Sequence, residues 1–165
     1  MKNNITLIGM PGAGKSTVGV VLAKVMGYRF VDSDLVIQEK TGKLLSEIIA
    51  EKGTEGFLQV EDDINTGLTC EKSVISTGGS AVYGKNAMAH LKEISTVVYL
   101  KLPYEKVEKR LGNLKDRGVA LKEGQTLKDL YEERCPLYEK YADVVIDADT
   151  TSVEGCMRRI LDEVK

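Results

Sequence analysis

The chain has 165 residues, of which 42% are hydrophobic and 29% are charged, and its formal net charge is −2. This length suits one compact domain with its own core. The slightly acidic balance argues against a nucleic-acid partner, and no apolar run is long enough to span a bilayer. The three cysteines are scattered and lack metal-ligand spacing, which is typical of reduced thiols, so we expect a cytoplasmic protein.

Short β-rich runs alternate with longer helical patterns from one end of the chain to the other. Strands are expected at 5–9, 29–32, 73–77, 96–100 and 143–147. Helices are expected at 16–26, from Asp34 to 42, at 46–70 with a break near Gly53, and at 85–93, 104–114, 126–140 and 152–164. Five apolar strands separated by helices predict an α/β fold, with a parallel sheet covered on both faces. Without a repeat or linker, residues 1–165 are predicted to form a single domain.

The first expected strand runs into a glycine-rich loop. Residues 9–17 read GMPGAGKST and match the phosphate-binding pattern G-x-x-x-x-G-K-[ST]. A helix follows at once, so backbone N–H groups and the helix N-terminus converge on the bound phosphates. Lys15 is expected to reach the β- and γ-phosphates of a nucleotide, and the Ser16 hydroxyl to bind Mg²⁺. The predicted nucleotide-binding residues here are Gly12, Ala13, Gly14, Lys15, Ser16 and Thr17.

The loop does not say which molecule receives the phosphate. GTPases need N-K-x-D and D-x-x-G, and neither pattern occurs in the chain. Motor-type and helicase-type ATPases need a strand that ends in an acidic pair, but the strand at 73–77 runs into GGS and the strand at 96–100 into KLP. The classes that transfer phosphate to water therefore lack their catalytic carboxylate.

Two acids remain at the end of a strand, in the stretch VDSD at 31–34. Asp32 and Asp34 are two positions apart, so on an extended segment their side chains point the same way. One could hold the water shell of the metal while the other faces the hydroxyl of an acceptor. The alternative is that Asp34 caps the helix that follows, and the two roles can coexist.

Taken together, the motifs resemble those of shikimate kinases. They are GMPGAGKST at 9–17, VDSD at 31–34, TGG at 77–79 and RCPLYEKYAD at 134–143, and they occur in order over almost the whole chain. The resemblance implies a three-layer P-loop kinase fold of the nucleoside-monophosphate-kinase type, with a five-stranded parallel sheet. It also implies a small substrate subdomain at about 33–60 and a lid at about 112–125.

The resemblance also implies roles for individual residues. On the nucleotide side, Ser16 and, through water, Asp32 would hold Mg²⁺, Arg110 would lie near the adenine, and Arg117 would be the lid arginine that acts with Lys15 in catalysis. The residues implied on the substrate side are Asp34 for the reacting hydroxyl, Gly78 and Gly79 for the wall, and Arg134 for the carboxylate of the substrate.

The departures from the family pattern lie on the substrate side and in the lid. Thr54 stands where the family has glutamate, Leu58 where it has the second arginine of the carboxylate clamp, and Ser80 where it has a third glycine. In the lid, RGVA at 117–120 replaces R-P-L-L. An arginine clamp reduced to Arg134 predicts weaker binding of an acceptor carboxylate.

The resemblance implies that the chain converts ATP and shikimate to ADP and shikimate 3-phosphate in aromatic-compound biosynthesis, with ATP and Mg²⁺ required. We expect a monomer that binds neither nucleic acid nor a membrane. Two alternatives stay open at this point: a related kinase acting on another hydroxy acid or polyol, and a nucleotide-binding regulatory protein without turnover.

Overall fold

The computed structural model describes residues 2–111, 122–149 and 151–164. Its centre is a five-stranded sheet in which every neighbouring pair of strands is parallel, in the order β2-β3-β1-β4-β5. The strands are β1 (Asn4–Ile8), β2 (Arg29–Asp32), β3 (Ser73–Ser76), β4 (Ser95–Lys101) and β5 (Val144–Asp147). The expected strands and the predicted fold class are thus confirmed.

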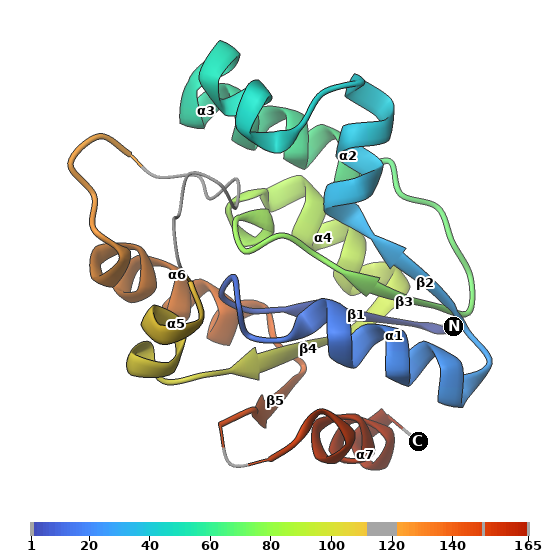
Figure 1. The fold of residues 1–165 in the computed structure, drawn as a ribbon. Coiled ribbons are helices and arrows are strands. Elements are labelled where there is room, and N and C mark those ends of the chain that lie inside the picture. The colour runs from blue at the N-terminus through green and yellow to red at the C-terminus, as the bar shows by residue number, and fades with distance from the viewer. Residues whose placement is uncertain (1, 112–121, 150, 165) are drawn as a thin grey trace.

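Helices cover both faces of the sheet, which gives three layers (Figure 1). The described helices are α1 (Lys15–Met26), α2 (Ser33–Thr41), α3 (Leu45–Thr66), α4 (Lys85–Ile94), α5 (Tyr104–Arg110), α6 (Leu127–Tyr141) and α7 (Val153–Val164), with a 3₁₀ turn, η1, at Ala81–Tyr83. Helices α1 and α7 pack together on one face, while α4 and α6 cover the other and α3 packs against α4. No helix in the described ranges has the length and apolar character needed to cross a membrane.

Several helix boundaries differ from those expected by one to four residues. The helix predicted to open at Asp34 begins at Ser33, because Asp32 caps it: Asp32 Oδ1 accepts hydrogen bonds from the N–H groups of Asp34 (2.9 Å) and Leu35 (3.3 Å). The predicted break at Gly53 is confirmed by its φ of 74° and ψ of 176°, but α3 ends at Thr66. Helix α5 ends at Arg110, four residues before the predicted end.

Most of the predicted lid, including Arg117, lies outside the described residues. Of the range 112–125, the structure describes residues 122–125, where the Lys122 N–H donates to Gln125 Oε1 at 3.1 Å. The lid and the role of Arg117 therefore stay predictions.

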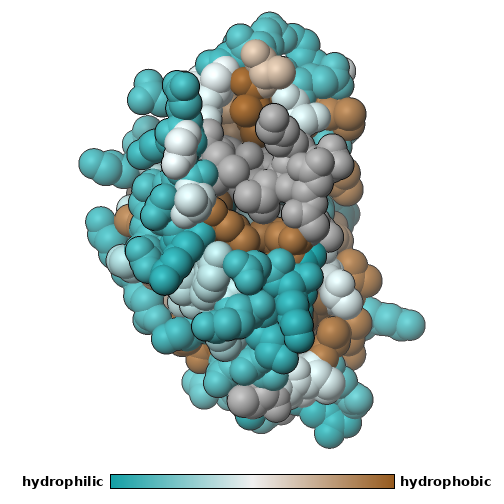
Figure 2. Space-filling model, turned by 60° about the vertical axis from the view of Figure 1, so that its left-hand side comes forward, coloured by the Kyte–Doolittle hydropathy of each residue, from teal (hydrophilic) through white to brown (hydrophobic). Residues whose placement is uncertain are grey.

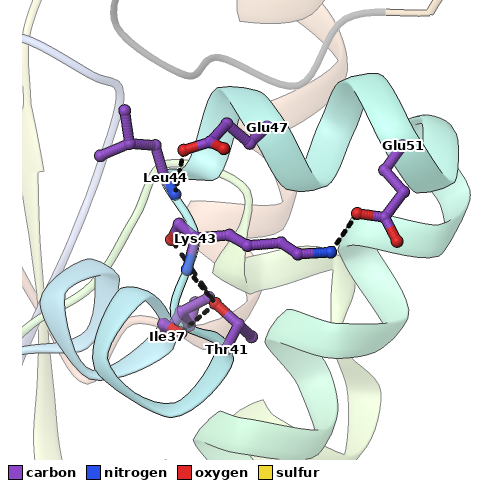
Figure 3. Close-up of polar contacts among 6 residues, drawn as sticks. All are labelled: Ile37, Thr41, Lys43, Leu44, Glu47 and Glu51. Carbon is purple, nitrogen blue, oxygen red and sulfur yellow. Dashed lines mark hydrogen bonds and ion pairs between the residues drawn. The ribbon is translucent and has the colours of Figure 1, made fainter.

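Local polar contacts turn the chain sharply between α2 and α3 (Figure 3). Thr41 Oγ1 donates to Ile37 O at 2.7 Å and accepts from the Lys43 N–H at 3.3 Å. Leu44 N–H donates to Glu47 Oε1, and the Lys43 ammonium pairs with Glu51. The turn brings the apolar faces of the two helices together in a small second core, which consists of Ile37, Leu45, Ile48 and Phe57.

Candidate active site

The segments that follow β1, β2 and β3 meet around a cavity of about 360 Å³, which α3 and α6 complete. Figure 2 shows the end of the molecule where these strands finish. Most of the coloured residues on this face are hydrophilic, and hydrophobic residues are exposed between them. The residues that line the cavity are Pro11, Gly12, Gly14, Lys15, Ser16, Thr17, Asp34, Leu45, Phe57, Thr77, Gly78, Gly79, Ser80 and Arg134.

The phosphate loop has the backbone that its sequence predicts. Gly14 precedes α1 with a φ of 94°, a conformation that suits glycine, and α1 then begins at Lys15. Five of the six predicted loop residues line the cavity. Ala13 does not: its side chain is buried and its N–H donates to Met10 O at 3.1 Å. Arg110 lies at the outer edge of the loop, where its Nη1 donates to Gly12 O at 3.0 Å.

Lys15 folds back over its own loop. Its Nζ donates to Gly9 O (2.7 Å) and to Met10 O (2.8 Å). Burial lowers the pKa of this ammonium to about 8, although the negative charges of Asp34 and Asp32 oppose the shift. Phosphate oxygens are stronger partners for an ammonium than carbonyl groups, so a bound nucleotide would draw Nζ from the loop into the cavity.

The expected metal ligands lie together beside the loop. Ser16 Oγ is 3.5 Å from Asp32 Oδ2 and 3.3 Å from Ser76 Oγ, which comes from the end of β3. This all-oxygen set suits Mg²⁺, which keeps several waters and takes one or two protein ligands plus phosphate oxygens. Among the described residues no group of three or more His, Cys, Asp or Glu side chains could hold a metal by itself. The residues fit an ion that is bound together with the nucleotide.

Asp34 faces the other part of the cavity, beside Gly78. An added Cβ on Gly78 would lie 2.5 Å from Asp34 Oδ1, so the carboxylate lies directly against that backbone. Burial, and to a lesser extent the nearby charge of Asp32, raise the pKa of Asp34 to about 6, against the effect of Lys15. The alternative that Asp34 caps α2 is excluded, because Asp32 is the cap. Asp34 is thus left to act on a ligand.

Gly79 and Arg134 form the wall opposite the loop. The Arg134 side chain is 1% exposed and its guanidinium lies over the Tyr83 ring, 5.4 Å from the ring centre. An added Cβ on Gly79 would lie 2.6 Å from Pro11 Cδ and 2.8 Å from Arg134 Nη1. The Tyr138 hydroxyl fixes this strip of backbone by donating to Gly79 O at 2.6 Å. Glycine at 79 therefore lets the phosphate loop and the arginine approach each other.

Replacing Gly79 by alanine is expected to destabilise the protein by roughly 1–3 kcal/mol, because the methyl group overpacks the wall. The displaced Arg134 should also raise the acceptor KM more than the ATP KM. Thermal unfolding and steady-state kinetics measure both effects. Gly67→Ala is the matched control, since Gly67 is exposed, has a φ of −86° and leaves ordinary contact distances for a Cβ. Equal behaviour of the two variants would contradict the close approach.

Several cavity residues were not among the predicted site residues. Thr77 and Ser80 flank the predicted glycine pair, so their position in TGGS was the available signal. Leu45 and Phe57 enter the wall through the small second core, which no motif marks. Leu58 differs from what the resemblance implies: it lies outside the cavity, in a separate hollow beside Asp62 and Tyr83.

Comparisons with known proteins agree with this geometry. The sequence model of a family described as shikimate kinase matches residues 11–165. The chain belongs to the shikimate kinase family. Its curated relatives in this family include the shikimate kinases of Histophilus somni, at 37% identity over 98% of this chain and 94% of the relative, and of Haemophilus influenzae, at 39% identity over 98% and 92%.

A solved shikimate kinase supports the same assignment at the level of the fold. The structure of the Acinetobacter baumannii enzyme in complex with shikimate superposes with a TM-score of 0.88 at 33% identity, over 99% of this chain and 93% of that one. As a member of the shikimate kinase family, this chain is a phosphotransferase that acts on a hydroxyl group and uses ATP.

Proposed function

We propose that this kinase transfers the γ-phosphoryl group of ATP to the 3-hydroxyl of shikimate and forms ADP and shikimate 3-phosphate. The observation that carries the proposal is that one cavity joins an intact phosphate loop, the carboxylate of Asp34 and the guanidinium of Arg134. These three parts match an acceptor that presents a hydroxyl at one end and a carboxylate at the other. Family membership and the shikimate-bound relative support the same acceptor.

In this proposal, each group of the cavity has one task. The loop N–H groups and Lys15 hold the phosphates, and Asp34 accepts the proton of the acceptor hydroxyl as the new bond to phosphorus forms. Arg134 binds the carboxylate, and with Gly78 and Gly79 it orients the hydroxyl toward the phosphate. Ser16 and, through water, Asp32 would hold Mg²⁺, which would neutralise part of the phosphate charge.

The remaining assignments extend the proposal to parts of the chain that the cavity does not include. Arg110, at the edge of the loop, would lie against the adenine of ATP. Arg117 in the lid would stabilise the transferring group, so that ATP is not spent on water. We also infer a cytoplasmic monomer whose product enters the synthesis of aromatic amino acids, with no nucleic-acid or membrane partner.

A coupled assay of ADP release tests the acceptor. Shikimate, quinate, gluconate and nucleoside monophosphates are compared at equal concentration, each with ATP and Mg²⁺. We expect shikimate to give the highest kcat/KM. Faster turnover of another hydroxy acid or polyol would assign the enzyme to a related small-molecule reaction. ATP binding without turnover of any acceptor would assign the chain to the non-catalytic alternative.

A further inference from the structure

A second carboxylate lies behind the acceptor wall. Glu61, on α3, is 2% exposed and does not line the cavity. Its Oε1 accepts a hydrogen bond of 2.6 Å from Ser80 Oγ, and no described residue donates to its buried Oε2. An added Cβ on Gly78 would lie 3.1 Å from that Oε2 and 2.5 Å from Asp34 Oδ1. The Glu61 carboxylate therefore lies against the same backbone that Asp34 contacts from the cavity.

Ser80 is the group that holds Glu61 in this place. Ser80 follows Gly79 directly and is 6% exposed. It lines the cavity, but its hydroxyl points to Glu61. A hydrogen bond to an ionised carboxylate is stronger than one between neutral groups, so this contact restrains the buried Glu61 side chain. Ser80 follows the glycine pair in TGGS, and a third glycine at this position would have no hydroxyl to offer.

The positive charge that acts on Glu61 is that of Arg134. The attraction of its guanidinium lowers the pKa of Glu61, while burial, the larger effect, raises that pKa. Arg134 is also the group that the proposed function assigns to the acceptor carboxylate. A Glu61 carboxylate that moved onto the guanidinium would compete with the acceptor, because both are carboxylates that seek the same N–H groups.

We propose that Ser80 is a positioning residue for acceptor binding: by donating its hydroxyl hydrogen bond to Glu61 Oε1, it holds the Glu61 carboxylate away from Arg134, whose guanidinium then meets the carboxylate of the acceptor. The proposal rests on the proposed function, since it takes Arg134 as the acceptor's partner. It adds two residues, Ser80 and Glu61, to those that set acceptor affinity, and both act through Arg134.

The proposal has a pH dependence. The pKa of Glu61 is raised to about 7: burial is the largest cause, Asp34 on α2 and Asp62 on α3 act in the same direction, and Ser80 and Arg134 oppose it. In Ser80→Ala, where the hydrogen bond from Ser80 to Glu61 is lost, the acceptor KM rises as pH rises, because Glu61 gains its negative charge and moves onto Arg134. At low pH the protonated Glu61 is neutral and the competition is weak. Glu61→Gln removes this pH dependence of the acceptor KM and leaves the titration of Asp34 in place.

Steady-state kinetics with shikimate and ATP test the pair. We expect Ser80→Ala to raise the shikimate KM about tenfold at pH 8, with ATP KM and kcat changed less than about twofold. In the Glu61→Gln background the same substitution should have no effect on the shikimate KM. Ser80→Ala that raises the KM equally in both backgrounds, or in neither, would overturn the proposal. If Ser80→Ala does not fold, the pair Ser80→Thr and Ser80→Val replaces it, because the two new side chains have the same size and only the first keeps a hydroxyl. Ser80→Val should then raise the shikimate KM, and Ser80→Thr should not.

A ligand-free measurement separates this inference from the proposed function. Carboxyl ¹³C NMR follows the titration of Glu61 in the wild type and in Ser80→Ala, with Glu61→Gln to assign the signal. If Ser80 restrains Glu61, its loss lets the carboxylate reach Arg134, and the pKa of Glu61 falls. If Ser80 only stabilises the ionised carboxylate through its hydrogen bond, its loss raises the pKa of Glu61. The inference then fails, whatever the acceptor is. A wild type that does not phosphorylate shikimate, with a lowered pKa in Ser80→Ala, would overturn the acceptor assignment and keep the positioning role.

Discussion

Replacing Lys15 by alanine is expected to lower kcat by a factor of about 10²–10³, the loss typical when one group that stabilises transition-state charge is removed. Lys15 Nζ donates hydrogen bonds to Gly9 O and Met10 O, within reach of the phosphates that the loop would hold. The variant should stay folded, because it also removes a buried charge that the protein holds at a reduced pKa.

Coupled kinetics and thermal unfolding check the Lys15 prediction together. Lys24→Ala is the matched control, because Lys24 belongs to the same helix and is exposed. Activity near the wild-type level in Lys15→Ala would exclude the phosphate loop from catalysis. A further expectation follows from the pKa of about 8: as pH rises above 8, the ligand-free lysine loses its charge and the Kd for ATP rises.

The second large effect is expected at Asp34. Asp34→Asn should lower kcat by a factor of about 10²–10⁴, the usual contribution of a positioned general base. The carboxylate is active when ionised, so wild-type kcat/KM for the acceptor should fall as pH drops through about 6, its raised pKa. Asparagine does not titrate, so the residual activity of the variant should lack this acidic limb.

The same substitution should stabilise the protein near pH 8. Because the folded-state pKa of Asp34 is about 6, against an ordinary value of 3.8, the folded protein holds the proton more tightly. The wild-type free energy of unfolding therefore falls as pH rises from about 4 to about 6, by at most about 3 kcal/mol from this group. Asp34→Asn avoids that loss, and denaturant unfolding at pH 4 and pH 8 measures it.

Glu39→Gln is the control for Asp34, since Glu39 is an exposed acid on the same helix. It should change neither kcat nor the pH dependence of unfolding. Full activity of Asp34→Asn, with its acidic limb unchanged, would show that another group accepts the proton.

The sequence was sufficient for the parts of this structure that rest on local patterns. Apolar runs predicted the five strands, and GMPGAGKST predicted the loop and the helix after it, because strand, glycine and helix signals agree there. The glycine at 53 predicted the break in α3. The alternative that Asp34 caps α2 does not hold: Asp32 and Asp34 are both good caps, and the place where β2 ends decides between them.

The substrate side of the site could not be predicted from local patterns. Phe57 and Leu45 reach the cavity through packing between α2 and α3, and neighbouring positions on a helix point in different directions, so Phe57 lines the cavity while Leu58 does not. The contact between Ser80 and Glu61 joins residues 19 positions apart on a loop and a helix. Such pairs depend on how the elements pack, which sequence spacing does not specify.

The central claim, that this kinase phosphorylates shikimate, is tested most directly by identifying the product. Purified protein is incubated with shikimate, ATP and Mg²⁺, and the mixture is analysed by ³¹P NMR and mass spectrometry against authentic shikimate 3-phosphate. The account predicts shikimate 3-phosphate in equal amount to ADP, and product formation at least about a hundredfold slower with Lys15→Ala under the same conditions. Intact shikimate after prolonged incubation with active, ATP-binding protein would contradict it.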